Sequence, residues 1–161
     1  MKQYIEKIIL SFDRIESLNS LMRVFDLINS HYSTKSVPQY FQNLDEVYKT
    51  RNDLYLIIIS YLFSLFDPSG INIIELIKAP ISDSAKSELK KIKEAWNPLR
   101  KPVTRIRHNL GFHGGNKKQR INGIKALDEI DKSHLIPSIV AFIQMLSSLS
   151  KALKNEIHDK A

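Results

Sequence analysis

The chain has 161 residues, of which 43% are hydrophobic and 25% charged, an ordinary balance for one folded domain. It contains no cysteine, which excludes disulfide frameworks, cysteine-ligated zinc or iron–sulfur sites and thiol catalysis, and fits a reducing cytosol. Its net charge of +7 favours polyanionic partners such as nucleic acids.

The first part of the chain predicts two long helices. Apolar residues recur at steps of three and four from about Lys2 to Ser30, which is the period of an amphipathic helix. Acidic residues lie among them and no small-residue cleavage site follows, so we expect no signal peptide. Pro38 suits the first turn of a second helix, which is apolar almost all round from Leu54 to Phe66. That run is about 13 residues long, short of the roughly 20 that cross a bilayer, and predicts a buried core helix.

Turn and capping signals divide the next part of the chain. The sequence Asp67-Pro-Ser-Gly70 predicts a turn, and a short helix is expected over residues 71–77. Ser82-Asp-Ser84 offers capping oxygens to a helix that extends to about Trp96, because Asn97-Pro98 predicts an end or a kink there.

The remaining signals predict two more helices. One opens at Lys101-Pro102, extends to Phe112 and ends at Gly114-Gly115. The last is capped by Asp131 or Ser133 and runs to about His158. No alternating strand pattern is present, so the predicted fold is all-α: a single helical bundle of about five to six helices, forming one domain over residues 1–161.

Residues suited to chemistry gather in the sequence Arg105-Ile-Arg-His-Asn-Leu-Gly-Phe-His113. Arginine binds phosphate through a planar, permanently charged guanidinium, and histidine can move a proton near neutral pH. Together they suffice for cleavage of RNA without a metal, because the ribose 2′-OH supplies the nucleophile. The spacing of one arginine and one histidine is not specific by itself, so the neighbouring residues carry the interpretation.

These residues resemble the motif of the HEPN superfamily, in which an arginine and a polar residue precede a histidine by four to six intervening positions. Arg107 matches the arginine, His108 the polar residue and His113 the histidine. The resemblance is sharp for about ten residues. It extends more loosely to the apolar run from Tyr61 to Asp67, which ends in an aspartate as in HEPN proteins of abortive-infection type.

The resemblance implies a HEPN-like helical bundle that forms a homodimer, with two motifs sharing one cleft. It implies a metal-independent endoribonuclease of toxin–antitoxin or phage-defence type, which needs no cofactor. An antitoxin partner such as a small nucleotidyltransferase is expected on the same ground. The lack of cysteine and the shortness of the apolar run predict a cytoplasmic protein that associates with no membrane. One HEPN subgroup carries a tyrosine two residues after the histidine, where this chain has Gly115, so regulation through that tyrosine is not expected here.

The expected roles of individual residues follow from the motif. Arg107 and His113 are the catalytic candidates, and no metal ligands are expected. The supporting candidates are His108, Asn109 and Arg105. The basic residues expected to steer RNA phosphates are Lys117, Lys118 and Arg120.

Helical geometry leaves the choice of arginine open. In a regular helix, positions 107 and 113 lie about 120° apart, whereas Arg105, Asn109 and His113 align. Either the helix is disturbed near Gly111, or Arg107 and His113 converge across a dimer, or Arg105 takes the arginine's role.

Two other functions remain open at the level of the sequence. The chain is either a non-catalytic HEPN-like module that binds RNA or a protein, or a plain helical interaction protein. Trp96, Tyr61 and Phe112 are expected in the core rather than as platforms on which bases stack.

Overall fold

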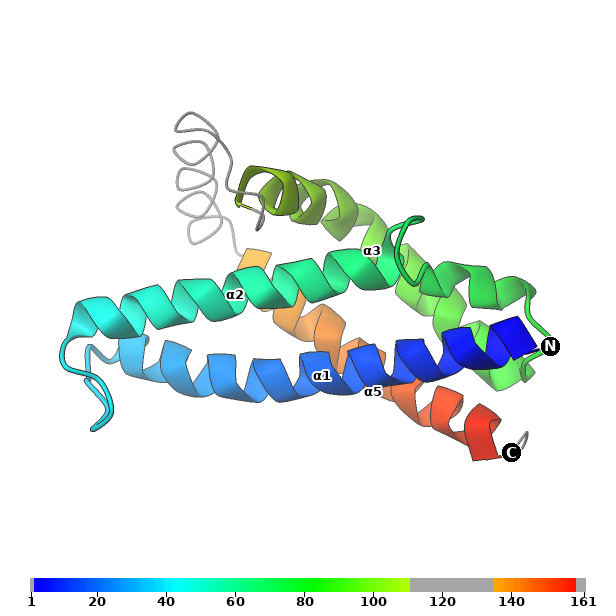
Figure 1. Cartoon of the computed structure of the whole chain (residues 1–161), viewed down its shortest axis with the longest axis horizontal. Coiled ribbons are helices and arrows are strands. Elements are labelled where there is room, and N and C mark those ends of the chain that lie inside the picture. Colours follow the sequence, from blue (N-terminus) through cyan, green and yellow to red (C-terminus); the bar gives the residue numbers. More distant parts are fainter. Residues whose placement is uncertain (1, 111–134, 159–161) are drawn as a thin grey trace.

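The computed structural model describes residues 2–110 and 135–158, and every regular element in them is helical (Figure 1). This confirms the predicted all-α bundle. The predicted helix end at the two glycines, and the predicted caps at Asp131 or Ser133, lie outside the described residues. The helices are α1 (Lys2–Ser33), α2 (Leu44–Phe66), η1 (Ile73–Lys78), α3 (Asp83–Leu110) and α5 (Leu135–His158).

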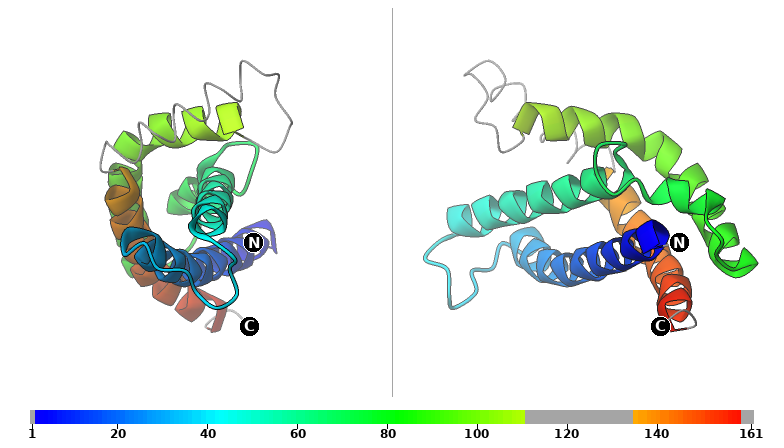
Figure 2. Two further views of the ribbon diagram at one scale, coloured as in Figure 1. Left: turned by 90° about the vertical axis from the view of Figure 1, so that its left-hand side faces the viewer. Right: turned by 45° about the vertical axis from the view of Figure 1, so that its right-hand side comes forward.

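The long helices α1 and α2 lie side by side and run in opposite directions, while α5 crosses behind them and packs against α1 and α3 (Figures 1 and 2). Along α1 the buried residues are spaced by three and four, as the sequence predicts. They are Ile8, Ser11, Ile15, Leu18, Met22, Phe25 and Ile28.

Polar contacts fix how α1 sits on α5. The hydroxyl of Ser150, which is buried, donates to the carboxylate of Glu16 at 2.6 Å. One turn away, the hydroxyl of Ser147 donates to the side-chain oxygen of Asn19 at 3.2 Å. Because buried polar groups must be paired, these bonds oppose sliding of one helix along the other.

The second helix begins at Leu44, so the prediction that Pro38 opens it is wrong. The reason is a reciprocal cap further along the chain. The side chain of Asn43 accepts from the backbone N–H of Glu46 at 3.0 Å, and the Glu46 carboxylate accepts from the backbone N–H of Gln42 at 2.9 Å. Pro38 instead belongs to a turn, where its carbonyl accepts from the N–H of Phe41.

Asn97-Pro98 does not end the helix, and the prediction that a new helix opens at Lys101-Pro102 is wrong, because α3 is continuous through both Pro98 and Pro102. Each proline removes one helical hydrogen bond, and Figure 2 shows that α3 curves along its length. Leu99 and Val103, each of which directly follows one of the prolines, are buried in the core. Their packing holds the segment helical against its local preference.

The beginning of α3 is fixed as predicted. The hydroxyl of Ser82 accepts from the backbone N–H of Ala85 at 3.2 Å, which caps the helix. The backbone N–H of Ser82 donates to the buried carboxylate of Glu156 at 2.8 Å, so the cap is also tied to the end of α5.

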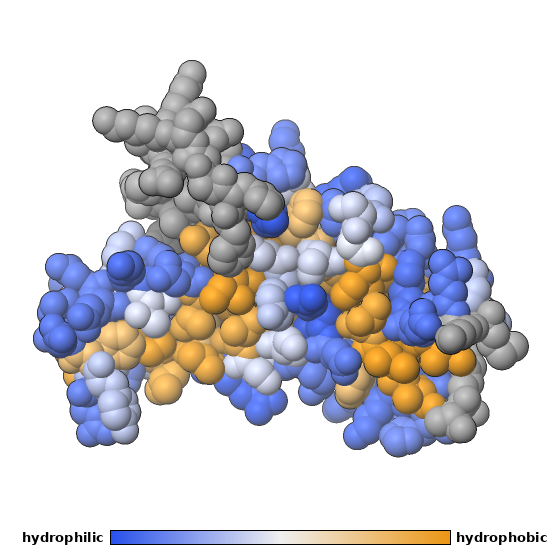
Figure 3. Space-filling view, viewed as in Figure 1, coloured by the Kyte–Doolittle hydropathy of each residue, from blue (hydrophilic) through white to orange (hydrophobic). Residues whose placement is uncertain are grey.

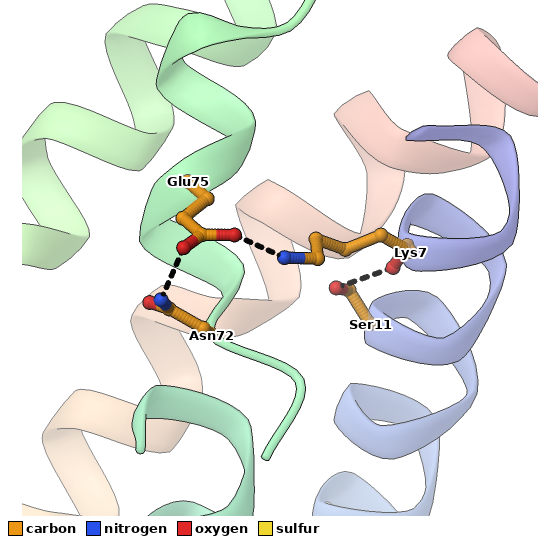
Figure 4. A network of polar contacts seen from close by, with 4 residues as sticks. All are labelled: Lys7, Ser11, Asn72 and Glu75. Carbon is orange, nitrogen blue, oxygen red and sulfur yellow. Dashed lines mark hydrogen bonds and ion pairs between the residues drawn. The ribbon is translucent and has the colours of Figure 1, made fainter. Parts of the chain in front are cut away.

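The predicted short helix after the Asp67–Gly70 turn is present as η1, a 3-10 helix that buries Ile73 and Leu76. Figure 4 shows how it is held on α1. Lys7 forms an ion pair with Glu75, whose other carboxylate oxygen accepts from the side chain of Asn72 at 2.8 Å. The hydroxyl of Ser11 donates to the backbone carbonyl of Lys7 at 2.7 Å.

Among the described helices, α5 alone is long and apolar enough to span a membrane by length and composition. A core helix of a folded domain meets the same test, and α5 buries one apolar side against α1 and α3. The buried residues on that side include Ile139, Phe142, Ile143, Leu146, Leu149 and Leu153.

Part of the apolar surface remains exposed. Figure 3 shows two areas of hydrophobic residues on the face seen in Figure 1, with hydrophilic residues between them. Helix α1 contributes four large hydrophobic residues to the exposed surface of the molecule. They are Ile9, Leu10, Val24 and Leu27.

Candidate functional site

The last turns of α3 carry the predicted residues that the structure describes. Arg107 is half-buried, whereas Arg105 and His108 are exposed. Asn109 lies in α3, but its side chain is not among those described. His113 lies outside the described residues, as does the predicted RNA-steering group Lys117, Lys118 and Arg120. The structure therefore describes one side of the predicted site.

Phe63 on α2 contacts both Arg107 and His108. The imidazole of His108 meets the phenyl ring edge-on, with the centroids 5.9 Å apart and the planes at 63°. The guanidinium carbon of Arg107 lies 5.9 Å from the centroid of the same ring, within the range of a cation–π contact. One aromatic side chain thus positions two adjacent residues of the predicted motif.

Arg105 lies on another side of α3. Residues two positions apart in a helix differ in direction by about 160°, so Arg105 and Arg107 cannot both face Phe63. The face of α3 that includes Arg107 also includes Arg100 and Thr104, seven and three positions earlier. Of the two candidate arginines, Arg107 is the one beside His108 and the aromatic ring.

An open pocket of about 170 Å³ lies beside these residues, between the end of α2 and the middle of α3. Behind it, the indole of Trp96 stacks on Phe66 with centroids 4.3 Å apart and planes at 15°. Trp96 is buried, as predicted, and yet forms part of the pocket wall. The lining residues are Phe63, Phe66, Asp67, Pro68, Trp96, Arg100, Thr104 and His108.

Asp67 supplies the carboxylate of this pocket. Its Oδ1 atom accepts from the backbone N–H of Ser69 at 2.8 Å and also from the Ser69 hydroxyl. The Ser69 hydroxyl, followed by its backbone N–H and the charges of His108 and Arg100, holds the pKa of Asp67 below its usual 3.8, although partial desolvation opposes this. The carboxylate is therefore ionised at neutral pH and acts only as an acceptor.

Positive charge is concentrated on α3. The helix carries eight lysine and arginine residues against three acidic ones, a net +5 compared with +7 for the whole chain. Its last acidic residue is Glu94, so the part that follows is purely basic. Such a concentration of positive charge favours anionic over cationic ligands at this half of α3.

Sequence reasoning missed the roles of Phe63, Asp67, Arg100 and Thr104 in the site. Arg100 and Thr104 could have been predicted from helical spacing, because they precede Arg107 and His108 by about two turns and one turn on the same face of the helix. Phe63 lies in α2 and Asp67 in the turn that follows it, and no local pattern reveals that this region meets α3. Within the described residues, no group of three histidine or acidic side chains is arranged to hold a metal ion.

Comparison of the chain with family models, curated proteins and solved structures finds no match. The resemblance to HEPN proteins therefore rests on residues of this sequence alone, which are the motif and, more loosely, the run from Tyr61 to Asp67.

Proposed function

We propose that this protein acts on RNA as a metal-independent endoribonuclease, with Arg107 and His113 at the cleaved linkage. The observation that carries the proposal is the end of α3, where Arg107 and His108 lie together on Phe63 beside a pocket lined by Arg100. The motif that resembles HEPN proteins thus begins in a positively charged surface with room for a ligand.

The proposed chemistry needs only the substrate and side chains. The 2′-oxygen of a ribose attacks the adjacent phosphorus while its proton passes to a base. The bond from phosphorus to the 5′-oxygen breaks as that oxygen takes up a proton from an acid. The products are a 2′,3′-cyclic phosphate and a free 5′-hydroxyl. His113 serves in proton transfer, and Arg107 stabilises the charge that builds on the phosphoryl oxygens.

The remaining motif residues have binding roles in this proposal. His108 and Asn109 orient the substrate, and Lys117, Lys118 and Arg120 steer the phosphates into the site. A homodimer brings two motifs together, and an antitoxin such as a small nucleotidyltransferase restrains the activity. These two partners are proposed from the resemblance alone.

A non-catalytic RNA- or protein-binding module is the second candidate function. It is favoured by the basic half of α3 and the aromatic pocket, which are sufficient for binding a nucleic acid without any turnover. Binding of this kind weakens steeply as the salt concentration rises, because each neutralised phosphate releases counterions.

The deciding experiment incubates the purified protein with total RNA, with and without EDTA, and analyses the fragment ends. The proposal expects cleavage that is insensitive to EDTA and fragments with 2′,3′-cyclic phosphates. His113→Ala is expected to abolish cleavage, and His158→Ala, which changes an exposed histidine at the end of α5, is the matched control. Undiminished cleavage by His113→Ala contradicts the mechanism. Salt-sensitive binding without cleavage supports the second candidate.

A further inference from the structure

We propose that the pocket between the end of α2 and α3 binds a guanine base of single-stranded RNA, with Asp67 accepting hydrogen bonds from the base's Watson–Crick edge. This inference rests on the proposed action on RNA and names the base that the site selects. It is carried by three features of the pocket: its aromatic walls, one ionised carboxylate and the guanidinium of Arg100 in the same lining.

The aromatic walls supply the affinity for a base. Phe63 and Trp96 both line the pocket, and Trp96 is backed by the stacked ring of Phe66. Trp96 is only 6% exposed, and Phe63 is partly covered by Arg107 and His108. A base in the pocket therefore gains from contact with the accessible parts of these rings, whichever base it is. The aromatic residues therefore account for affinity toward any base, and the polar residues account for selectivity among the bases.

In this proposal, Asp67 determines which base the pocket prefers. With Oδ1 engaged by Ser69, the structure gives Oδ2 no hydrogen-bond donor among the described residues. Guanine presents two neighbouring donors, N1–H and the 2-amino group, to such an acceptor. Adenine and cytosine present one amino group beside an acceptor nitrogen, and uracil presents one N–H between two carbonyls. A carboxylate repels acceptors, so guanine is the best match.

Arg100 and His108 complete the complementarity. Both are exposed side chains of the pocket lining. A guanidinium donates to the O6 and N7 acceptors of guanine. Arg100 is therefore suited to these two atoms, while Asp67 accepts from N1–H and the 2-amino group. His108 adjoins Arg107, so a base held in the pocket has its phosphate close to the proposed catalytic arginine.

The test uses the protein's single tryptophan, which lines the pocket. Guanosine 5′-monophosphate and inosine 5′-monophosphate are titrated against the purified full chain, and Trp96 fluorescence is followed. Inosine lacks only the 2-amino group, so the pair isolates one hydrogen bond. Guanosine monophosphate is expected to quench the fluorescence and to bind about tenfold more tightly than inosine monophosphate. Equal affinities overturn the proposal without requiring any variant.

Asp67→Asn provides the second arm. It is expected to weaken guanosine monophosphate binding about tenfold and to remove the preference over inosine monophosphate. The matched control is Asp45→Asn, an exposed aspartate at the opposite end of α2, which keeps the wild-type preference. A preference that survives Asp67→Asn overturns the assignment.

Two further outcomes separate this inference from the ribonuclease proposal. Inorganic phosphate is titrated alone, and an equal quench by phosphate shows an anion site and overturns base recognition. The nucleotide titrations involve no cleavage, so guanine selectivity stands if the ribonuclease assay fails. Conversely, EDTA-insensitive cleavage together with no response of Trp96 to any nucleotide overturns the pocket proposal and leaves the ribonuclease proposal intact.

Discussion

The imidazole of His108 contacts the ring of Phe63 edge-on, with centroids 5.9 Å apart. This contact joins the last turns of α3 to the last turn of α2, and Arg107 lies against the same ring. The proposed site is therefore built where two helices end, and the turn that follows α2 contributes the carboxylate of Asp67.

The choice between the two arginines gives the first prediction. Arg107→Ala is expected to lower RNA cleavage about 10²–10³-fold, because in the proposed mechanism this side chain supplies the charge that stabilises the transition state. Arg105→Ala, on another side of α3, is expected to lower cleavage by less than about tenfold, through weaker attraction of the polyanion. Cleavage rates at saturating RNA measure both effects. A larger loss in Arg105→Ala would reassign the arginine's role.

The turn after α2 gives the second prediction. A Cβ atom on Gly70 would lie 2.3 Å from the backbone carbonyl oxygen of Ser64, which the helix holds in place. Gly70→Ala is therefore expected to destabilise the fold by about 1–3 kcal/mol and to distort the Asp67 turn. Pro68→Ala, in the same turn but exposed, is the comparison and is expected to cost less than about 1 kcal/mol. Urea unfolding followed by Trp96 fluorescence measures both, and equal losses would contradict the close contact.

The sequence predicts local features of this fold better than long-range ones. The Asp67–Gly70 turn, the short helix after it and the Ser82 cap follow from residues adjacent in the chain, and all three are present. Pro98 by itself leaves both an end and a kink of the helix possible, and the helix continues because burial of Leu99 outweighs the local preference of a proline.

The same distinction applies to the site. Arg107 and His108 can be found from the sequence because the motif groups them. The run from Tyr61 to Asp67, which includes Phe63, is indicated only loosely by the resemblance. Its contribution to the site depends on how α2 packs against α3, and that packing is set by the whole core. Trp96 is predicted correctly as a core residue, but burial on one side did not predict that its other side borders a pocket.

The packing of α1 gives the third prediction, from one substitution made at two positions of the same helix. Leu18 is fully buried, whereas Leu27 is 59% exposed. Leu18→Ala is expected to cost about 2–5 kcal/mol of unfolding free energy, because it leaves a cavity in the core. Leu27→Ala is expected to change it by no more than about 0.5 kcal/mol. Chemical denaturation compares the two, and similar losses would contradict the orientation of α1.

The carboxylate of Asp67 gives the fourth prediction, because the hydroxyl of Ser69 is the main cause of its lowered pKa. Ser69→Ala removes that donor but keeps the backbone N–H, so the pKa of Asp67 is expected to rise toward 3.8. A lowered folded-state pKa stabilises the fold above the unfolded value near 3.8, and this contribution is lost as the pH falls through the folded-state pKa. Ser69→Ala is therefore expected to reduce stability at neutral pH, and the part of the loss that depends on the carboxylate disappears below that pKa.

The pH titration of the side-chain carboxyl carbons by NMR measures this shift directly. Glu75 is the internal control. Its pKa is lowered mainly by Lys7, and Ser69 is not among the causes, so the pKa of Glu75 should be the same in both proteins. If the Asp67 titration midpoint is the same in wild type and Ser69→Ala, the hydroxyl is not the main cause of the lowered pKa. The backbone N–H of Ser69 and the charge of Arg100 would then be among the groups that lower it.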